Sequence, residues 1–353
     1  MLDMNVSRRW VLRGAAGLGG MAIVGCTSTR QRTLAADPRF PVMDEQRYAP
    51  LTLDVYAGDL KQTNVGLDGI PKVEGPDFTS ASEASEWLDD GDIVFGFVHE
   101  GDVRAYPQRI LVWHEVVNDE VGGLPVAITY CPMVGDILAI ERGSEVFQVS
   151  GKLVNSNLTV ADSSSLSYFP QMLGVGVEGA HYGRAFVERP IVWTTWGQWR
   201  ALHPETRVMA RPTEFGRDYN RDPYGSYNPV SGYYAENEPP MFPPLNSDDR
   251  AAPKAIFVGA RTTDQAVAFS LDRLRQEGRL QADAGGQTFT ALYDPALDIG
   301  YVYRGSMSRT PSLSGGFPDR IASGAIDGTE PVNGFPANWF AWAGYYPDVV
   351  AVM

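Results

Sequence analysis

The sequence predicts a β-rich α+β fold made of two related halves, each combining strands with short helices. Short runs of apolar and β-branched residues recur along the chain, with glycine, proline or aspartate turns between them. The 8 Trp, 16 Tyr and 15 Phe residues also favour strands and half-buried surfaces. Finally, a pattern of short motifs that begins at residue 93 returns at residue 256.

Residues 1–25 predict a twin-arginine export signal. Arg8 and Arg9 precede a short, glycine-rich apolar run at residues 15–25. This run is too short to cross a bilayer as a helix, which needs about 20 residues. The alternative is a basic N-terminus that arose by chance. An export signal implies that the protein works on the periplasmic or cell-surface side of the membrane.

The apolar run ends at a cysteine, as in the lipobox of bacterial lipoproteins. Ile23, Val24 and Gly25 precede Cys26. We therefore expect lipidation of Cys26 after export, with ordinary signal-peptide cleavage as the alternative. More than one acyl chain on one residue gives stable anchoring, so the membrane is the expected partner.

Charge and cysteine content exclude some classes of protein. The formal net charge is −14, which makes the chain a poor partner for nucleic acid or for anionic lipid headgroups. The chain has two cysteines. Acylation of Cys26 would leave Cys131 without a disulfide partner, so stability is expected to come from packing.

Composition divides the remaining chain into four segments. Residues 26–50 are polar and are expected to tether the protein to the membrane, and residues 51–212 form the first half, which carries the candidate site. Residues 213–253 are a connecting segment rich in Tyr and Pro, whose tyrosines argue against disorder throughout. Residues 254–353 form a second, degenerate half.

Local signals position the elements of the first half. Ser80 and Glu83 have capping-box spacing and open a short helix through residue 88. Thr195 is the expected cap of another helix, which Pro204 ends. The other expected elements are strands over 93–98, 103–107 and 125–130, a short helix over 108–117, a hairpin of 137–142 with 146–150, and a further strand over 152–160.

An internal repeat supports the two halves. Residues 93–96 and 105–106 align without a gap with residues 256–259 and 268–269, at an offset of 163. The motif Trp196-x-x-Trp199 aligns with Trp339-x-x-Trp342 at an offset of 143, with Asn338 at the helix-cap position. Two copies fit a duplicated α+β unit, with a pseudo-twofold axis as one possible arrangement. The second copy lacks a histidine and a cysteine equivalent to His114 and Cys131.

Two neighbouring motifs predict where any chemistry lies. The first contains His114, one of four histidines, and Glu115, and the second contains Cys131 and Met133. Cys131, Met133 and His114 would be soft ligands suited to copper or another soft metal. Alternatively, Cys131 would be a thiol nucleophile with His114 as base and a carboxylate such as Glu115 as the orienting group. The structural alternative is a buried cysteine, a core methionine and a hydrogen-bonded histidine.

A binding site without chemistry is the other hypothesis. Tyr224 belongs to a tyrosine-rich stretch at residues 218–234, which with Trp193 and its neighbouring tryptophans would line a groove for a glycan, a peptide or a small ligand. Lys152, Asn155 and Asn157 form a polar cluster that would either tie strands together or form a second wall, with Lys152 holding an anion. Contact between His114 and Cys131 would favour chemistry. A histidine bound to a backbone carbonyl would favour binding.

These motifs resemble the DUF3179 family, a domain of unknown function. The resemblance covers residues 65–352 and rests on Trp113-His114-Glu115 and Thr129-Tyr130-Cys131-Pro132, among others. In the family pattern a second cysteine and a serine stand at the positions of Val134 and Asp136. This chain therefore cannot use a CxxC pair for redox chemistry or metal binding. The resemblance itself implies no established activity. Together with the export signal and Cys26, it predicts an exported, membrane-anchored DUF3179-like protein of unknown activity that binds a ligand or partner. The alternative is a soft-metal or thiol-dependent enzyme.

Overall fold

The computed structural model describes residues 40–43 and 47–353. The expected export signal, Cys26 and most of the expected tether lie outside these residues. Within them the fold is β-rich, with many short strands in several sheets and only short helices. This confirms the predicted β-rich α+β class. None of the described helices is long and apolar enough to cross a membrane.

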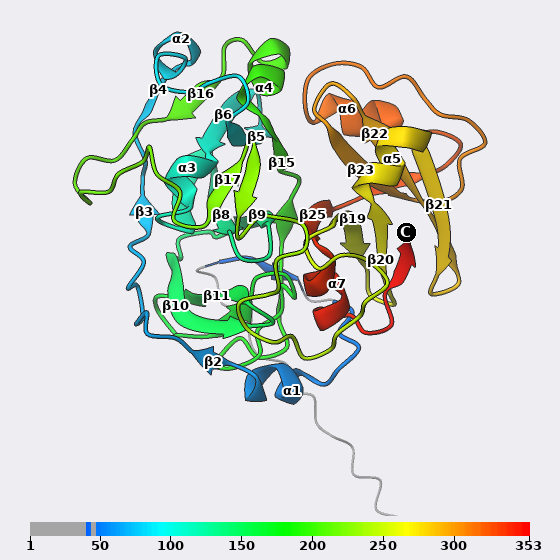
Figure 1. Ribbon diagram of the computed structural model, residues 1–353, viewed down its shortest axis with the longest axis horizontal. Helices are drawn as coiled ribbons and strands as arrows, with labels where there is room; N and C mark the ends of the chain where they lie inside the picture. Colours follow the sequence, from blue (N-terminus) through cyan, green and yellow to red (C-terminus); the bar gives the residue numbers. More distant parts are fainter. Residues whose placement is uncertain (1–39, 44–46) are drawn as a thin grey trace, which may run out of the picture. The chain divides into compact units, whose positions relative to one another are not determined.

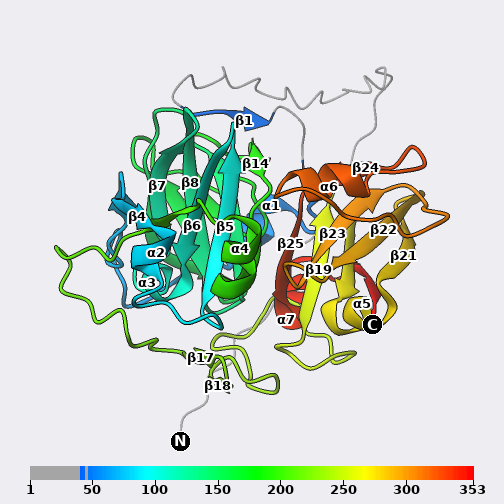
Figure 2. The ribbon, with the colours of Figure 1, turned by 90° about the horizontal axis from the view of Figure 1, so that it is seen from above.

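Three stacked sheets build the first half, on the left of Figure 2. The outer sheet on one side has the order β15 (Val192–Thr195), β5 (Ile93–His99), β6 (Asp102–Pro107), β16 (Arg207–Met209), β4 (Phe78–Ser80). The middle sheet has the order β14 (Glu188–Arg189), β9 (Asp136–Glu141), β8 (Leu124–Cys131), β7 (Val116–Val121), β3 (Val73–Glu74). The other outer sheet has the order β12 (Tyr168–Pro170), β11 (Asn157–Asp162), β10 (Phe147–Val154), β2 (Lys61–Gln62). The short helices are α1 (Leu53–Gly58), α2 (Ala81–Ala84), α3 (Gln108–Leu111) and α4 (Trp196–Leu202).

The middle sheet is buried on both faces. Along β8, Ile128 and Tyr130 pack toward the sheet of β5 and β6, whereas Ala127 and Cys131 pack toward the sheet of β10 and β11. Side chains alternate between the two faces of a strand, so both sets must be apolar here. This explains the continuous apolar run that predicted the strand.

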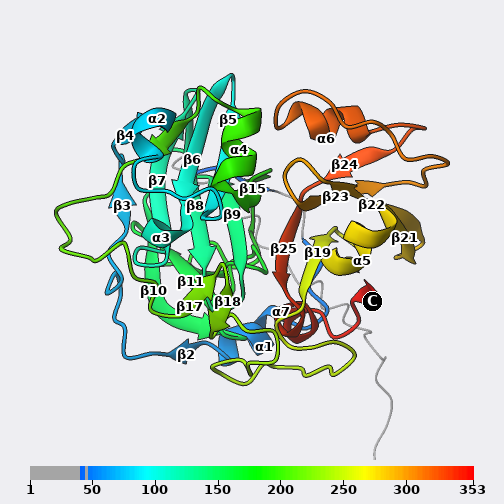
Figure 3. The same ribbon diagram turned by 45° about the horizontal axis from the view of Figure 1, so that its top comes forward.

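The second half, on the right of Figures 1 and 3, repeats two of the three sheets of the first. One sheet has the order β25 (Gly334–Asn338), β19 (Ile256–Arg261), β20 (Ala266–Ser270), β26 (Val350–Val352). The other has the order β21 (Arg279–Ala284), β22 (Gln287–Asp294), β23 (Ile299–Arg304), β24 (Glu330–Val332). The helices of this half are α5 (Leu271–Glu277), α6 (Asp319–Gly324) and α7 (Trp339–Tyr345). Strand β16 is parallel to β6, and β26 is parallel to β20 in the same way. Both halves belong to one compact unit.

Element boundaries recur at the offsets seen in the sequence. Strand β7 begins at Val116 and β21 begins at Arg279, 163 residues later. Helix α4 begins at Trp196 and α7 begins at Trp339, 143 residues later. The offset falls from 163 to 143 because the first half carries four additional strands between its repeated parts, namely β10, β11, β12 and β13 (Ala185–Phe186). Strand β13 pairs with β1 (Val42–Met43).

Equivalent residues make equivalent contacts in the two halves. A Cβ atom on Gly96 would lie 2.2 Å from the Trp199 ring, and one on Gly259 would lie 2.5 Å from the Trp342 ring. Such distances leave no room for a side chain, so each glycine lets an indole ring pack against the strand. The motif match therefore reflects a shared packing solution.

The repeat also identifies what replaces the candidate residues in the second half. The β8–β9 and β22–β23 turns align at the offset of 163, so Cys131 corresponds to Asp294. Asp294 forms an ion pair with Arg320, with Nε–Oδ2 at 2.6 Å. Glu115 corresponds to Gly278, and both have left-handed backbones, with φ of 58° and 72°.

Some element boundaries differ from the prediction. The helix expected over 108–117 ends as α3 at Leu111, and β7 begins at Val116. The hairpin expected around Gly143 is wrong, because β9 and β10 belong to different sheets. The hairpin forms instead between β10 and β11, where Asn155 and Ser156 have positive φ. Residues 213–253 are mainly irregular, with a small hairpin of β17 (Gly225–Tyr227) and β18 (Val230–Gly232).

Candidate functional site

His114 is a buried, fully hydrogen-bonded histidine. Its Nδ1 lies 2.7 Å from the Pro71 carbonyl oxygen and its Nε2 lies 2.7 Å from the Tyr219 hydroxyl. The ring centre of Phe215 lies 4.7 Å from that of His114. Burial lowers the pKa of His114. Both ring nitrogens are therefore occupied by neighbours that are not part of the predicted metal set or triad.

Cys131 lies on the other side of the middle sheet. Its Sγ accepts a hydrogen bond from the Leu158 backbone N–H at 3.3 Å, and the residue is fully buried. Burial raises the pKa of the thiol, with the Asp136 and Glu115 carboxylates adding to the effect. The neighbours of His114 pack on one face of the sheet and Cys131 packs on the other. The structure does not bring the two side chains together.

The predicted metal set and triad are therefore not assembled. Met133 is buried in the same core cluster as Cys131, apart from His114. Asp119, a second carboxylate four residues after Glu115, accepts a hydrogen bond from the Tyr106 hydroxyl at 2.6 Å. Within residues 40–43 and 47–353, no group of three or more His, Cys, Asp or Glu side chains could hold a metal ion.

Glu115, unlike His114, belongs to the surroundings of Cys131. The residue is 4% exposed, and its carboxyl group makes no hydrogen bond or ion pair with any residue that the structure describes. Burial raises the pKa of Glu115 to about 8. Charge on Glu115 acts on both Cys131 and Tyr224. A left-handed, buried and unpaired glutamate is costly, which makes it a candidate for a functional role.

Lys254 completes this buried group and was missed in the sequence. Its Nζ donates a hydrogen bond to the Met133 carbonyl oxygen at 3.1 Å and lies 3.2 Å from the ring centre of Tyr233. Burial lowers the pKa of Lys254 to about 7, although Cys131 and Glu238 oppose that shift. The available signal was a lysine two residues before the apolar strand β19.

Tyrosines of the connecting segment cover this group. Asp222 accepts hydrogen bonds from Gln108 at 2.8 Å and from Tyr234 at 2.9 Å, and Gln108 also reaches the Tyr130 hydroxyl at 3.2 Å. The Tyr227 and Tyr234 rings stack with their centres 3.9 Å apart. The segment is thus ordered by a network of ring contacts and hydrogen bonds.

The polar cluster of the first half has structural partners. Lys152 lies 3.6 Å from the Glu178 carboxylate and 3.8 Å from the Tyr168 ring centre. The Asn155 Oδ1 accepts a hydrogen bond from the Leu245 N–H at 2.6 Å. Asn157 donates to Asp136 and Gln171 and accepts from the Met172 N–H. These contacts support the interpretation of a network that ties strands together.

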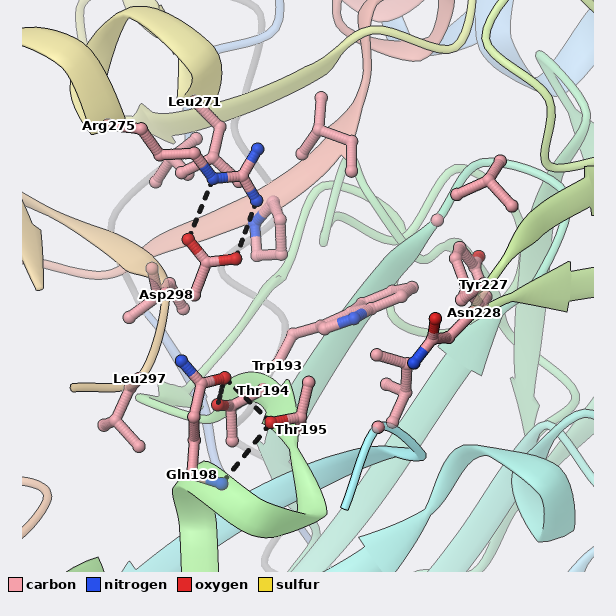
Figure 4. Close-up of a pocket in the computed structure, with 18 of the residues that line it drawn as sticks. Trp193, Thr194, Thr195, Gln198, Tyr227, Asn228, Leu271, Arg275, Leu297 and Asp298 are labelled. Carbon is pink, nitrogen blue, oxygen red and sulfur yellow. Dashed lines mark hydrogen bonds and ion pairs between the residues drawn. The ribbon is translucent and has the colours of Figure 1, made fainter. Parts of the chain in front are cut away.

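A cleft of about 340 Å³ lies between the two halves (Figure 4). Trp193 and Gln198 come from the first half, Tyr227 and Asn228 from the connecting segment, and Asn338 from the second half. Repeat equivalents line it in pairs, among them Ile93 with Ile256, Thr195 with Asn338, and Gly135 with Asp298. Trp196 and Trp199 are buried in the core instead, and Tyr224 does not line this cleft.

Several hydrogen-bonding groups at the cleft have no partner among the described residues. Asn338 is 9% exposed and occupies the N-cap position of α7, yet its side-chain amide makes no hydrogen bond there. The Gln198 Oε1 accepts hydrogen bonds from Thr194 and Thr195 at 3.2 and 2.9 Å, which leaves its Nε2 unbonded (Figure 4). The Trp193 indole N–H and the Asn228 amide are also unbonded within the described chain.

The charges at the cleft neutralise each other. Arg275 Nε and Nη2 each lie 2.8 Å from an Asp298 oxygen, and Arg275 Nη1 lies 2.7 Å from Asp272 (Figure 4 shows the Arg275–Asp298 pair). The cleft therefore offers apolar and aromatic surface with neutral donors and acceptors. This combination suits an uncharged ligand that carries polar groups.

The comparisons with known proteins identify the family but no activity. A family model described as "Protein of unknown function (DUF3179)" matches residues 67–349. No curated protein and no solved structure matches the chain. The matched range contains most of both halves, the whole connecting segment and every cleft residue named above. Because the model matches well over half of the sequence, the chain belongs to the DUF3179 family.

Proposed function

We propose that this DUF3179 protein is an exported, lipid-anchored protein that binds a small uncharged ligand in the cleft between its halves. The observation that carries the proposal is the side-chain amide of Asn338, which lines the cleft and makes no hydrogen bond to the described residues. A ligand in the cleft could therefore accept from and donate to this amide without displacing a protein partner.

The shape and composition of the cleft support the same conclusion. Its volume of about 340 Å³ is near the lower end of the range for small-molecule sites, about 300–1,000 Å³. Trp193 is held by edge-to-face contacts with Phe95, Tyr130 and Tyr227, with ring centres 5.1, 5.8 and 5.2 Å away. A fixed aromatic ring supplies contact area at low entropic cost.

Binding can be tested with a library of neutral metabolites and sugars, followed by changes in melting temperature and intrinsic fluorescence. A ligand found in this way should bind at least tenfold more weakly to Asn338→Ala and to Trp193→Ala, because each change removes a cleft contact. Asn64→Ala is the matched control, since Asn64 is exposed and does not line the cleft. Equal binding by all four proteins would contradict the proposal.

The export and anchoring part rests on Arg8, Arg9 and Cys26. We expect the mature protein to begin at a Cys26 that carries acyl chains, and we expect Cys26→Ser to move from the membrane fraction to the soluble fraction. Mass spectrometry of the mature N-terminus and cell fractionation measure these two outcomes. An unmodified Cys26 in membrane-extracted protein would overturn lipidation, whereas Arg8→Lys with Arg9→Lys should block export.

A further inference from the structure

We propose that the cleft continues past Tyr227 and Asn228 into a second compartment, and that the two together bind a short chain of uncharged sugar units. This inference rests on the proposed function and specifies its ligand. A second cavity, of about 190 Å³, is lined on one side by Gly91, Ile93, Tyr227 and Asn228. These four residues also line the first cavity. The two cavities therefore adjoin at shared walls.

The second compartment is more polar than the first. Its other lining residues include Gln108, Asn220, Asp222 and Ser226. Both carboxylate oxygens of Asp222 already have hydrogen-bond partners within the protein. Its Oδ2 accepts hydrogen bonds from Gln108 and Tyr234, and its Oδ1 accepts one from the Tyr224 N–H at 2.8 Å. The side-chain amide of Asn220 makes no hydrogen bond in the described chain. It is free to bond a ligand.

The charges exclude ligands with a strong net charge. Asp92 in the second compartment pairs with Arg109, with Oδ1–Nη2 at 2.6 Å, as Asp298 pairs with Arg275 in the first. The remaining carboxylate, Asp222, repels anions. A cation would have to displace the donors that already occupy the Asp222 oxygens. A neutral ligand meets neither obstacle.

Sugar units match the free groups. The amides of Asn338, Asn228 and Asn220 each offer donors and an acceptor, as the hydroxyl groups of a sugar do. Trp193 offers an aromatic surface for the apolar C–H face of a pyranose ring, and its N–H is unbonded among the described residues. Neither compartment alone is large, so a ligand that uses all of these groups must span both.

The test is calorimetric titration of the full chain, carrying Cys26→Ser for solubility. The probes are two series of one to four units, β-1,4-linked N-acetylglucosamine and α-1,4-linked glucose, together with an array of neutral glycans. We expect affinity in the preferred series to rise at least tenfold between one unit and three. Asn220→Trp should reduce this gain to less than twofold by filling the second compartment, whereas Asn64→Trp should retain the full gain.

The outcomes separate the inference from the proposed function. If a neutral ligand binds through Asn338 and Trp193 but chain length has no effect, the second compartment is wrong and the cleft proposal stands. If an array of extended peptides binds in the cleft and no glycan does, the sugar class is wrong. If no neutral ligand of any kind binds, both proposals fail. Unchanged length dependence in Asn220→Trp would also overturn the second compartment.

Discussion

Glu115 combines two features that disfavour a glutamate. Its backbone is left-handed, with φ of 58°, where the second half has Gly278 with φ of 72°. Its carboxyl group is also buried and unbonded within the described residues. A non-glycine residue in this backbone region and an unpaired buried carboxyl each cost free energy. The ionisation of Glu115 should therefore contribute measurably to the pH dependence of the free energy of unfolding.

Raising the pH should destabilise the protein through Glu115. Its pKa is raised from 4.5 to about 8, so between these values the folded state holds a proton that the unfolded state has lost. The stabilisation that this proton provides is fully present below pH 4.5 and is lost as the pH rises through 8. Over that range the free energy of unfolding falls by no more than about 1.4 kcal/mol per pH unit. Glu115→Gln should remove this contribution. Urea unfolding at pH 5.5 and 6.5 measures it.

Two features of this experiment separate the effect of Glu115 from that of other ionisable groups. Folding lowers the pKa of Lys254 from 10.5 to about 7. The titration of Lys254 therefore increases stability as the pH rises, opposite to the effect of Glu115, and it does so mainly above pH 7. The chosen pH values lie below that window. Glu100→Gln alters an exposed glutamate and serves as the control. Parallel stability profiles for the natural chain and Glu115→Gln would show that Glu115 ionises normally in the fold.

At the residue scale, the sequence predicted local hydrogen bonding better than side-chain direction. Ser80 and Thr195 cap their helices as their spacing predicted, because the partners lie three residues away. The separation of His114 from Cys131 depends on strand pairing across the whole middle sheet. The sequence showed neither that pairing nor the left-handed turn at Glu115, so contact between the two remained open.

At the level of elements, each strand–helix unit depends on one glycine beneath a tryptophan. Gly96→Ala would place a methyl group 2.2 Å from the Trp199 ring, and Gly259→Ala would place one 2.5 Å from the Trp342 ring. We expect each change to lower the free energy of unfolding by roughly 1–3 kcal/mol or more, because the indole ring must move in a packed core. Chemical denaturation monitored by tryptophan fluorescence measures the loss.

Gly58→Ala is the matched control for these substitutions. Gly58 has nothing within 4 Å of its added Cβ, and it lies at the end of α1. It should change stability by less than about 0.5 kcal/mol. Small effects at both Gly96 and Gly259 would mean that the indole rings have room to shift, and that the shared motif does not reflect shared packing.

The misplaced hairpin shows what local signals cannot supply. Gly143 and Ser144 form a turn signal between two apolar runs, which predicted that the runs pair. The chain instead leaves the middle sheet at Glu141 and enters another sheet at Phe147. A turn signal marks where a strand ends, but the choice of sheet depends on which apolar faces remain to be covered.

At the scale of the whole molecule, the repeat was predictable but the cleft was not. The offsets of 163 and 143 in the sequence recur in the element boundaries because glycine–tryptophan packing keeps the motifs recognisable. The cleft forms where Thr195 and Asn338, equivalent positions of the two halves, approach the same space. Only the packing of one half against the other creates it.

The halves should unfold together, because α7 of the second half completes the core of the first. All residues of α7 are buried, and Trp339, Trp342 and Tyr345 belong to the same core cluster as Leu153 and Val154. The Tyr345 hydroxyl donates to the Val154 carbonyl oxygen at 3.1 Å. Neither half can keep this core closed alone, so we expect a single cooperative transition.

Tyr345→Phe tests this coupling without removing the ring. Loss of the hydroxyl should lower stability by roughly 0.5–1.5 kcal/mol, the usual net contribution of a hydrogen bond. Native-state hydrogen exchange should show the same decrease for amides of β8 in the first half and of β22 in the second, since both exchange through one global opening. A decrease in only one of these strands would mean that the halves are separate folding units, joined by the tyrosine-rich segment and meeting at the cleft only by docking.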